Sequence, residues 1–167
     1  TGAGIGHLSA WFFNHFEQEG GLSNFQMIEE GNRFAVILTR LKERYSSVPA
    51  SIVVGTPSLL SSELKAWNIS KIGEPPMLPN ADAIIVDSIM TRLADDVKSM
   101  LPLLNKNGVL FTVEPTPPVG DREEDDPEVV GFNKWMELIQ STNETHHLAF
   151  APLFGGTIVA WIGKDQD

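Results

Sequence analysis

The most constraining feature of the sequence is the alternation of short apolar runs with longer amphipathic segments along almost the whole chain. Strand-like apolar runs are expected at residues 25–28, 50–54, 81–86 and 109–113. Helices are expected at residues 7–18, 32–45, 59–67, 91–104 and 128–140. Because strands that are apolar throughout must be covered on both sides, this alternation predicts an α/β fold. We expect a mainly parallel sheet with helices on both faces.

The end of the chain predicts a different kind of strand pairing. Residues 147–151 and 157–162 flank a Gly155-Gly156 turn, which indicates an antiparallel hairpin at one edge of the sheet. The length of 167 residues suits one domain with a real core. We therefore predict a single domain over residues 1–167.

Composition and charge exclude several classes of function. The chain carries 22 acidic and 12 basic residues, a net charge of −10, so a phosphate backbone would be repelled and nucleic acid is not expected as a partner. Its longest apolar runs are far too short to cross a bilayer, so no membrane partner is expected. The chain contains no cysteine, which excludes disulfides and thiolate metal sites and fits a cytoplasmic protein.

Three glycines alternate directly before the first expected helix, at Gly2, Gly4 and Gly6. Glycines let the backbone approach a ligand closely and adopt positive φ without steric cost. The helix that follows aims free N–H groups and the positive end of its dipole at this turn. The pattern therefore fits a nucleotide-like ligand. A flexible chain end made of small residues has the same composition, so the glycines alone leave both interpretations open.

Polar residues follow the expected strands at their carboxyl ends, where α/β sheets bind ligands. Glu29 follows the first of these strands, with Glu30 beside it, and Asp87 and Glu114 follow two later ones. An acid after the strand that follows a glycine turn can accept hydrogen bonds from both hydroxyls of a ribose. Glu29 is the candidate for this contact.

The tight Gly-x-Gly-x-Gly spacing, the acid after the next strand and the closing hairpin resemble S-adenosylmethionine-dependent methyltransferases. Residues 82–87, 100–110, 126–133 and 151–160 are similar to segments of the small catechol/caffeoyl-CoA-type O-methyltransferases. The resemblance covers nearly all of the chain. It implies a Rossmann-like methyltransferase fold, S-adenosylmethionine as cofactor, a small-molecule acceptor and a homodimer.

The resemblance also implies roles for individual residues. The cofactor-binding residues of that family correspond to Gly2, Ala3, Gly4, Gly6, Glu29, Glu30, Thr56 and Asp87 of this chain. The glycine turn would hold the methionine part, Glu29 the ribose, and the turn at Thr56 would lie near the adenine. The family commonly has Asp where this chain has Thr56, which puts the adenine contact in doubt.

The divalent-metal site of that family is incomplete in this sequence. Asp87 matches the first carboxylate of that site. The family's other ligands are an Asp-Asn pair just after its fifth strand, and this pair aligns with Val113 and Glu114, at the end of the strand expected over residues 109–113. Valine cannot ligate a metal, and one or two carboxylates alone make a poor site. We therefore expect no metal, with a metal-independent route or no catalysis. His7 is the nearest candidate base, although a histidine at a helix start is more often bonded to backbone, so the catalytic residue stays unassigned.

A glycine turn of this class follows a central strand, and no residue precedes Thr1. We therefore expect that the first strand is missing from the chain and that the domain is N-terminally truncated. The leading hypothesis is an O-methyltransferase that acts on a small molecule. The second is a methyltransferase-like fold kept for interaction, without turnover. A nicotinamide-dependent oxidoreductase is the third, and the glycine spacing and terminal hairpin speak against it.

Overall fold

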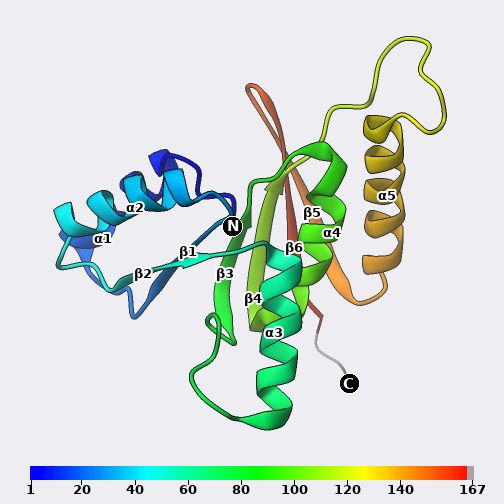
Figure 1. The fold of residues 1–167 in the computed structure, drawn as a ribbon. Helices are drawn as coiled ribbons and strands as arrows, with labels where there is room; N and C mark the ends of the chain where they lie inside the picture. The colour runs from blue at the N-terminus through cyan, green and yellow to red at the C-terminus, as the bar shows by residue number, and fades with distance from the viewer. Residues whose placement is uncertain (165–167) are drawn as a thin grey trace. The chain divides into compact units, whose positions relative to one another are not determined.

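The computed structural model describes residues 1–164, which form two compact units divided between Pro79 and Asn80 (Figure 1). Each unit contains strands connected by helices, which confirms the predicted α/β class. The single domain predicted over residues 1–167 stays a prediction. No helix in residues 1–164 combines the length and the apolar character needed to span a membrane.

The first unit is built around a parallel pair of strands. Its elements in chain order are α1 (His7–Glu19), β1 (Phe25–Glu29), α2 (Asn32–Arg44), β2 (Ala50–Val54) and α3 (Pro57–Ser70). The two strands pair in register, with Met27 opposite Ile52 and Glu29 opposite Val54. The carboxyl ends of both strands therefore lie at the same edge.

The core of this unit joins both helices that flank β1 to the strand itself. Phe13 of α1 and Leu38 of α2 are completely buried, and Met27 of β1 is 2% exposed. Burying a side chain of this size contributes roughly 1.5–3 kcal/mol. These contacts fix the start of α1 relative to the end of β1, which positions the glycine turn.

The second unit carries a mixed sheet. Its elements are β3 (Ala81–Val86), α4 (Met90–Met100), a 3₁₀ turn at Leu101–Leu103, β4 (Leu104–Val113), α5 (Pro127–Thr142), β5 (His146–Leu153) and β6 (Gly156–Gly163). The strand order is β3-β4-β6-β5. β3 and β4 are parallel, whereas β6 runs antiparallel to both β4 and β5. The predicted C-terminal hairpin is confirmed.

Aromatic packing attaches α5 to this sheet. Trp135 of α5 and Trp161 of β6 meet edge to face, with ring centroids 5.6 Å apart, and both side chains are almost completely buried. The Trp161 indole N–H donates a 2.9 Å hydrogen bond to the hydroxyl of Thr142, so the buried polar atom of the ring is satisfied.

The predicted helix over residues 91–104 and the strand beginning at Val109 are wrong at their junction. α4 ends at Met100, and Leu104 is the first residue of β4, where it pairs with Ala81 of β3. Pro102 has no N–H to donate to the preceding turn, so the helix tightens into a 3₁₀ turn and stops. Asn107, at φ 64°, lies within β4 instead of preceding it, beside a register shift between the two strands.

The central strand expected before Thr1 stays a prediction. Among the strands of residues 1–164, β1 pairs with β2 alone and β3 with β4 alone. The remaining expected elements are present, with ends that differ from the predicted ones by a few residues.

Candidate functional site

The glycine turn adopts a backbone conformation that favours glycine. Gly2, Gly4 and Gly6 have φ values of 69°, 53° and 83°, all in the left-handed region. Gly6 also precedes α1 as its N-cap, and a Cβ placed there would lie 2.9 Å from methyl carbons of both Leu38 and Leu41. A side chain at Gly6 would therefore strain the backbone and collide with α2.

Hydrogen bonds hold this turn against the end of β1. The N–H groups of Gly2 and Ala3 donate to the Ile28 carbonyl at 3.1 and 3.4 Å. Within the turn, the Gly6 N–H donates to the Ala3 carbonyl at 2.9 Å. These bonds indicate that the turn is an ordered loop, and they speak against the alternative of a flexible chain end.

Glu29 connects the loops at this edge. Its Oε2 accepts a 2.8 Å hydrogen bond from the Gly4 N–H, and its Oε1 accepts one of 3.0 Å from the Gly31 N–H. The Glu29 carbonyl accepts a further bond from the Gly55 N–H at 3.1 Å. The structure thus brings Glu29 and the glycine turn together, as the sequence predicts, and shows a bonding role that the sequence did not reveal.

Glu29 is 8% exposed, and its carboxylate retains capacity to accept more hydrogen bonds. An ionised carboxylate offers about four acceptor positions on its two oxygens, and the two backbone N–H groups occupy two of them. The residues present therefore fit a ligand that offers a pair of hydroxyl donors. Glu30, the next residue, is exposed.

Thr56 lies at the neighbouring strand end, next to Gly55. Its Oγ1 accepts a 3.2 Å hydrogen bond from the Leu59 N–H and so caps the N-terminus of α3. Pro57 occupies the first position of the helix, which needs no N–H donor. The hydroxyl therefore has a structural role that accounts for its presence. His7 begins α1 and is exposed.

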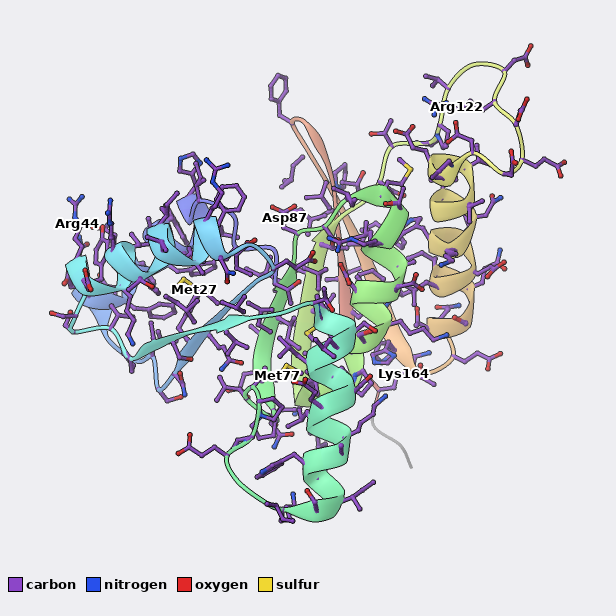
Figure 2. All side chains as sticks on the ribbon, viewed as in Figure 1. Met27, Arg44, Met77, Asp87, Arg122 and Lys164 are labelled. Atoms are coloured by element: carbon purple, nitrogen blue, oxygen red, sulfur yellow. The ribbon has the colours of Figure 1, made fainter. Side chains whose placement is uncertain are left out.

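In the second unit, Asp87 follows β3 and Glu114 follows β4, as predicted. Asp87 is exposed at the upper end of β3 in the view of Figure 2. Val113 is 57% exposed, and the Glu114 N–H donates to the Thr157 carbonyl at 2.8 Å. Within residues 1–164, no group of three or more histidine, aspartate and glutamate side chains is arranged to hold a metal ion.

Directly after Asp87, a buried acid anchors the chain, and sequence reasoning missed it. The Ser88 hydroxyl donates a 2.6 Å hydrogen bond to the Oδ2 of Asp96, a residue of α4 that is only 5% exposed. Asp96 falls on the inward face of the helix together with Leu93 and Val97. A signal was present, because an acid at an apolar position of a helical pattern must find a partner when it is buried.

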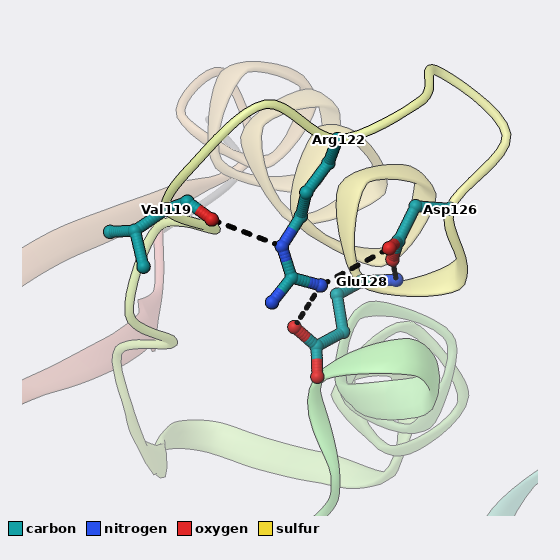
Figure 3. Close-up of polar contacts among 4 residues, drawn as sticks. All are labelled: Val119, Arg122, Asp126 and Glu128. Carbon is teal, nitrogen blue, oxygen red and sulfur yellow. Dashed lines mark hydrogen bonds and ion pairs between the residues drawn. The ribbon is translucent and has the colours of Figure 1, made fainter.

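A second feature absent from the sequence interpretation is an arginine that orders the loop before α5 (Figure 3). Arg122 forms ion pairs with Asp126 at 3.1 Å and with Glu128 at 2.8 Å, and its Nε donates to the Val119 carbonyl. Asp126 caps α5 by accepting the Glu128 N–H. This backbone hydrogen bond, helped by the Arg122 charge, lowers the pKa of Asp126 below its usual 3.8. These contacts order the loop that leads into α5.

No protein-family model matches the chain, and no curated protein matches its sequence. Its fold is similar to that of the O-methyltransferase TomG from Streptomyces achromogenes, which is involved in tomaymycin synthesis and was solved in complex with SAM. The TM-score is 0.66 at 15% identity, over 98% of this chain and 71% of that one. A protein from Corynebacterium glutamicum matches with a TM-score of 0.63 at 13% identity, over 96% and 82%.

An O-methyltransferase family protein from Burkholderia thailandensis matches with a TM-score of 0.61 at 10% identity, over 99% of this chain and 50% of that one. At such identities the similarity concerns the fold alone. The chain has the α/β fold of Rossmann-like methyltransferases, including the antiparallel C-terminal hairpin.

Proposed function

We propose that this chain is an S-adenosylmethionine-dependent O-methyltransferase domain that acts on a small molecule without a divalent metal. The observation that carries the proposal is the glycine turn held by the Glu29 carboxylate at the carboxyl end of β1. The similarity of the fold to that of a methyltransferase solved with SAM supports it, and the resemblance of the sequence favours the catechol/caffeoyl-CoA type.

In this proposal the first unit holds most of the cofactor. The backbone of Gly2, Ala3, Gly4 and Gly6 presents a surface without large side chains to the methionine part. The N-terminus of α1 contributes the positive end of its dipole, which favours a carboxylate. The remaining acceptor positions of Glu29 receive the ribose hydroxyls. Glu30 and Thr56 complete the proposed set in this unit, and Asp87 is proposed from the resemblance of the sequence alone.

Methyl transfer makes modest demands on the protein. The cofactor supplies a methyl group that is already activated by its sulfonium. The chain must align the acceptor oxygen with that methyl group and accept or relay the acceptor proton. Val113 cannot ligate a metal, so a metal-independent route is proposed, and the base remains unassigned.

Calorimetric titration of the full-length protein with S-adenosylhomocysteine tests the proposal. We expect saturable heat and a rise in melting temperature, and NADH should give neither. A matched pair of variants, Glu29→Gln at the turn and Glu43→Gln on the exposed face of α2, makes the same chemical change at both places. Only the first should weaken binding. No detectable heat or thermal shift with the wild-type protein would overturn the proposal.

A second candidate function is cofactor binding without turnover, as in a fold kept for interaction. It is favoured by the exposed Val113 at the position of a metal ligand and by the engagement of the Thr56 hydroxyl in capping α3. Transfer of a labelled methyl group from S-adenosylmethionine to any of a panel of small hydroxylated acceptors would exclude it. Binding of the cofactor without transfer to any of them would favour it.

Homodimer formation and a cytoplasmic location belong to the same proposal. Sedimentation velocity of the full-length protein distinguishes a dimer from a monomer directly. A sedimentation coefficient that stays monomeric over a wide concentration range would contradict the homodimer.

A further inference from the structure

The second unit contains a pocket, open to solvent and called the cavity below, that the proposed function does not use. It has a volume of about 500 Å³, within the range of small-molecule sites. It lies where three elements meet: the start of β4, the start of β5 and the end of β6. His146 is paired with Gly163 across the β5–β6 ladder, so these residues share one edge of the sheet.

This cavity lies at the opposite end of β3 from Asp87. Ala81, the first residue of β3, pairs with Leu104 at the cavity wall, whereas Asp87 follows the last residue. Six strand residues separate the two ends by about 17 Å. Figure 2 shows Asp87 and Lys164 at opposite ends of the sheet of this unit. The cavity is therefore a separate feature and does not depend on the proposed methyltransferase function.

The wall of the cavity carries both basic and apolar side chains. Lys106, Lys164 and His146 line it together with Leu101 and Leu104. This gathering of basic groups occurs in a chain whose net charge is −10. Burial, and then the Lys164 charge, lower the pKa of His146 below its usual 6.5. The positive charge of Lys164 therefore acts on His146, and it would also act on an anion bound beside the histidine.

Lys164 and His146 are held in place by neighbouring backbone and side-chain groups. The Lys164 ammonium donates to the carbonyl of Asn143 at 2.6 Å and lies 3.5 Å from that of Glu144. An ammonium has three N–H donors, so it can hold these carbonyls and still donate to a ligand. The Nδ1 of His146 lies 2.8 Å from the Thr145 hydroxyl, which leaves Nε2 as its second polar atom.

We propose that this cavity binds a small organic anion. Its phosphate or carboxylate group is held by Lys106, Lys164 and His146, and its carbon part lies against Leu101 and Leu104. Charge-assisted hydrogen bonds to the two lysines supply the affinity, and the apolar wall selects an anion that carries a hydrocarbon group over inorganic phosphate.

The test is a two-dimensional NMR titration of the full-length protein with phenyl phosphate, benzoate, inorganic phosphate and benzyl alcohol. We expect saturable shifts confined to residues 101–106, 146 and 163–164 with at least one of the two organic anions. The organic anion that binds more tightly shows whether the site prefers a phosphate or a carboxylate group. Inorganic phosphate should bind more weakly, and benzyl alcohol should give no saturable shift. Binding should also raise the titration midpoint of His146, because an anion stabilises its charged form.

Three variants make the test specific. Lys106→Gln and Lys164→Gln each remove one charge from the cavity, and Lys98→Gln removes one from an exposed position on α4. We expect each of the first two to weaken binding about tenfold and the third to leave it unchanged. The proposal is overturned if neither organic anion gives saturable shifts. It is also overturned if benzyl alcohol binds as well, or if Lys98→Gln weakens binding as much as the cavity variants do.

Discussion

Replacing Glu29 with glutamine tests whether its carboxylate holds the glycine turn. The substitution keeps the length and shape of the side chain and turns one acceptor oxygen into an NH₂ donor. In the structure both oxygens accept, from the Gly4 N–H at 2.8 Å and from the Gly31 N–H at 3.0 Å. A glutamine can satisfy one of these backbone groups, but it must then direct its own N–H groups at the other.

The expected cost has two parts. The surviving hydrogen bond changes from charge-assisted to neutral, which removes about 1 kcal/mol. The other N–H group loses its partner beside a side chain that is 8% exposed, and an unsatisfied buried donor costs about 1–3 kcal/mol. We therefore expect the variant to lower the free energy of opening this turn by about 2–4 kcal/mol.

Amide hydrogen exchange measures this loss of stability at Gly4 and Gly31, the two residues whose N–H groups the carboxylate holds. The protection factors of the Gly4 and Gly31 amides should fall by about 30- to 1,000-fold. Protection in β5 and β6 of the second unit should be unchanged, and the Glu43→Gln control on exposed α2 should leave the protection of both glycines as it is. If the variant keeps the protection of Gly4 and Gly31, the carboxylate does not hold the turn and the reasoning is wrong.

Three further predictions concern other parts of the chain. In Gly131→Ala the added Cβ would lie 2.8 Å from the Met90 carbonyl oxygen; overpacking should outweigh the gain in helix propensity and lower stability by about 1 kcal/mol, and an unchanged or higher melting temperature would contradict this. Because the pKa of Asp126 is lowered on folding, its contribution to stability is present above pH 3.8 and lost as the pH falls through the folded value; Asp126→Asn should flatten stability against pH there. Thr56→Val should cost about 1 kcal/mol by removing the cap on the Leu59 N–H, whereas Thr56→Asp should keep stability within about 0.5 kcal/mol, and equal melting temperatures for both would refute the capping role.

The strands were predictable because most of them are apolar runs with turn residues at their ends, and the one serious error shows what such patterns lack. Residues 101–104 are rich in leucine, which fits the inward face of a helix and the first turn of a buried strand equally well. What decides between them is the pairing of Leu104 with Ala81, a contact across 23 residues. Local periodicity carries no information about such a partner, so the boundary was placed too late.

The candidate site also has a part that the sequence predicts and a part that it does not. The residue types of the glycine turn and the acid after β1 follow from the sequence, because backbone conformation and chemistry require them. The Gly31 N–H as partner of Glu29, and the Ser88 hydroxyl as partner of Asp96, depend on how loops and helices meet. Of these partners, only Asp96 is visible in the sequence pattern, because it is a charged residue on the inward face of α4.

The double role of Glu29 changes what ligand binding has to achieve. The Gly4 N–H is already bonded to its carboxylate without any ligand, so the turn is ordered in advance. A ligand that enters does not pay the entropy of ordering this segment, and more of its binding energy remains as affinity. The same carboxylate is proposed to receive the ribose, so a Glu29 variant disturbs both the turn and the contact. Protection of the Gly31 amide in the ligand-free protein separates the two: if it survives while S-adenosylhomocysteine binding is lost, the contact itself was removed.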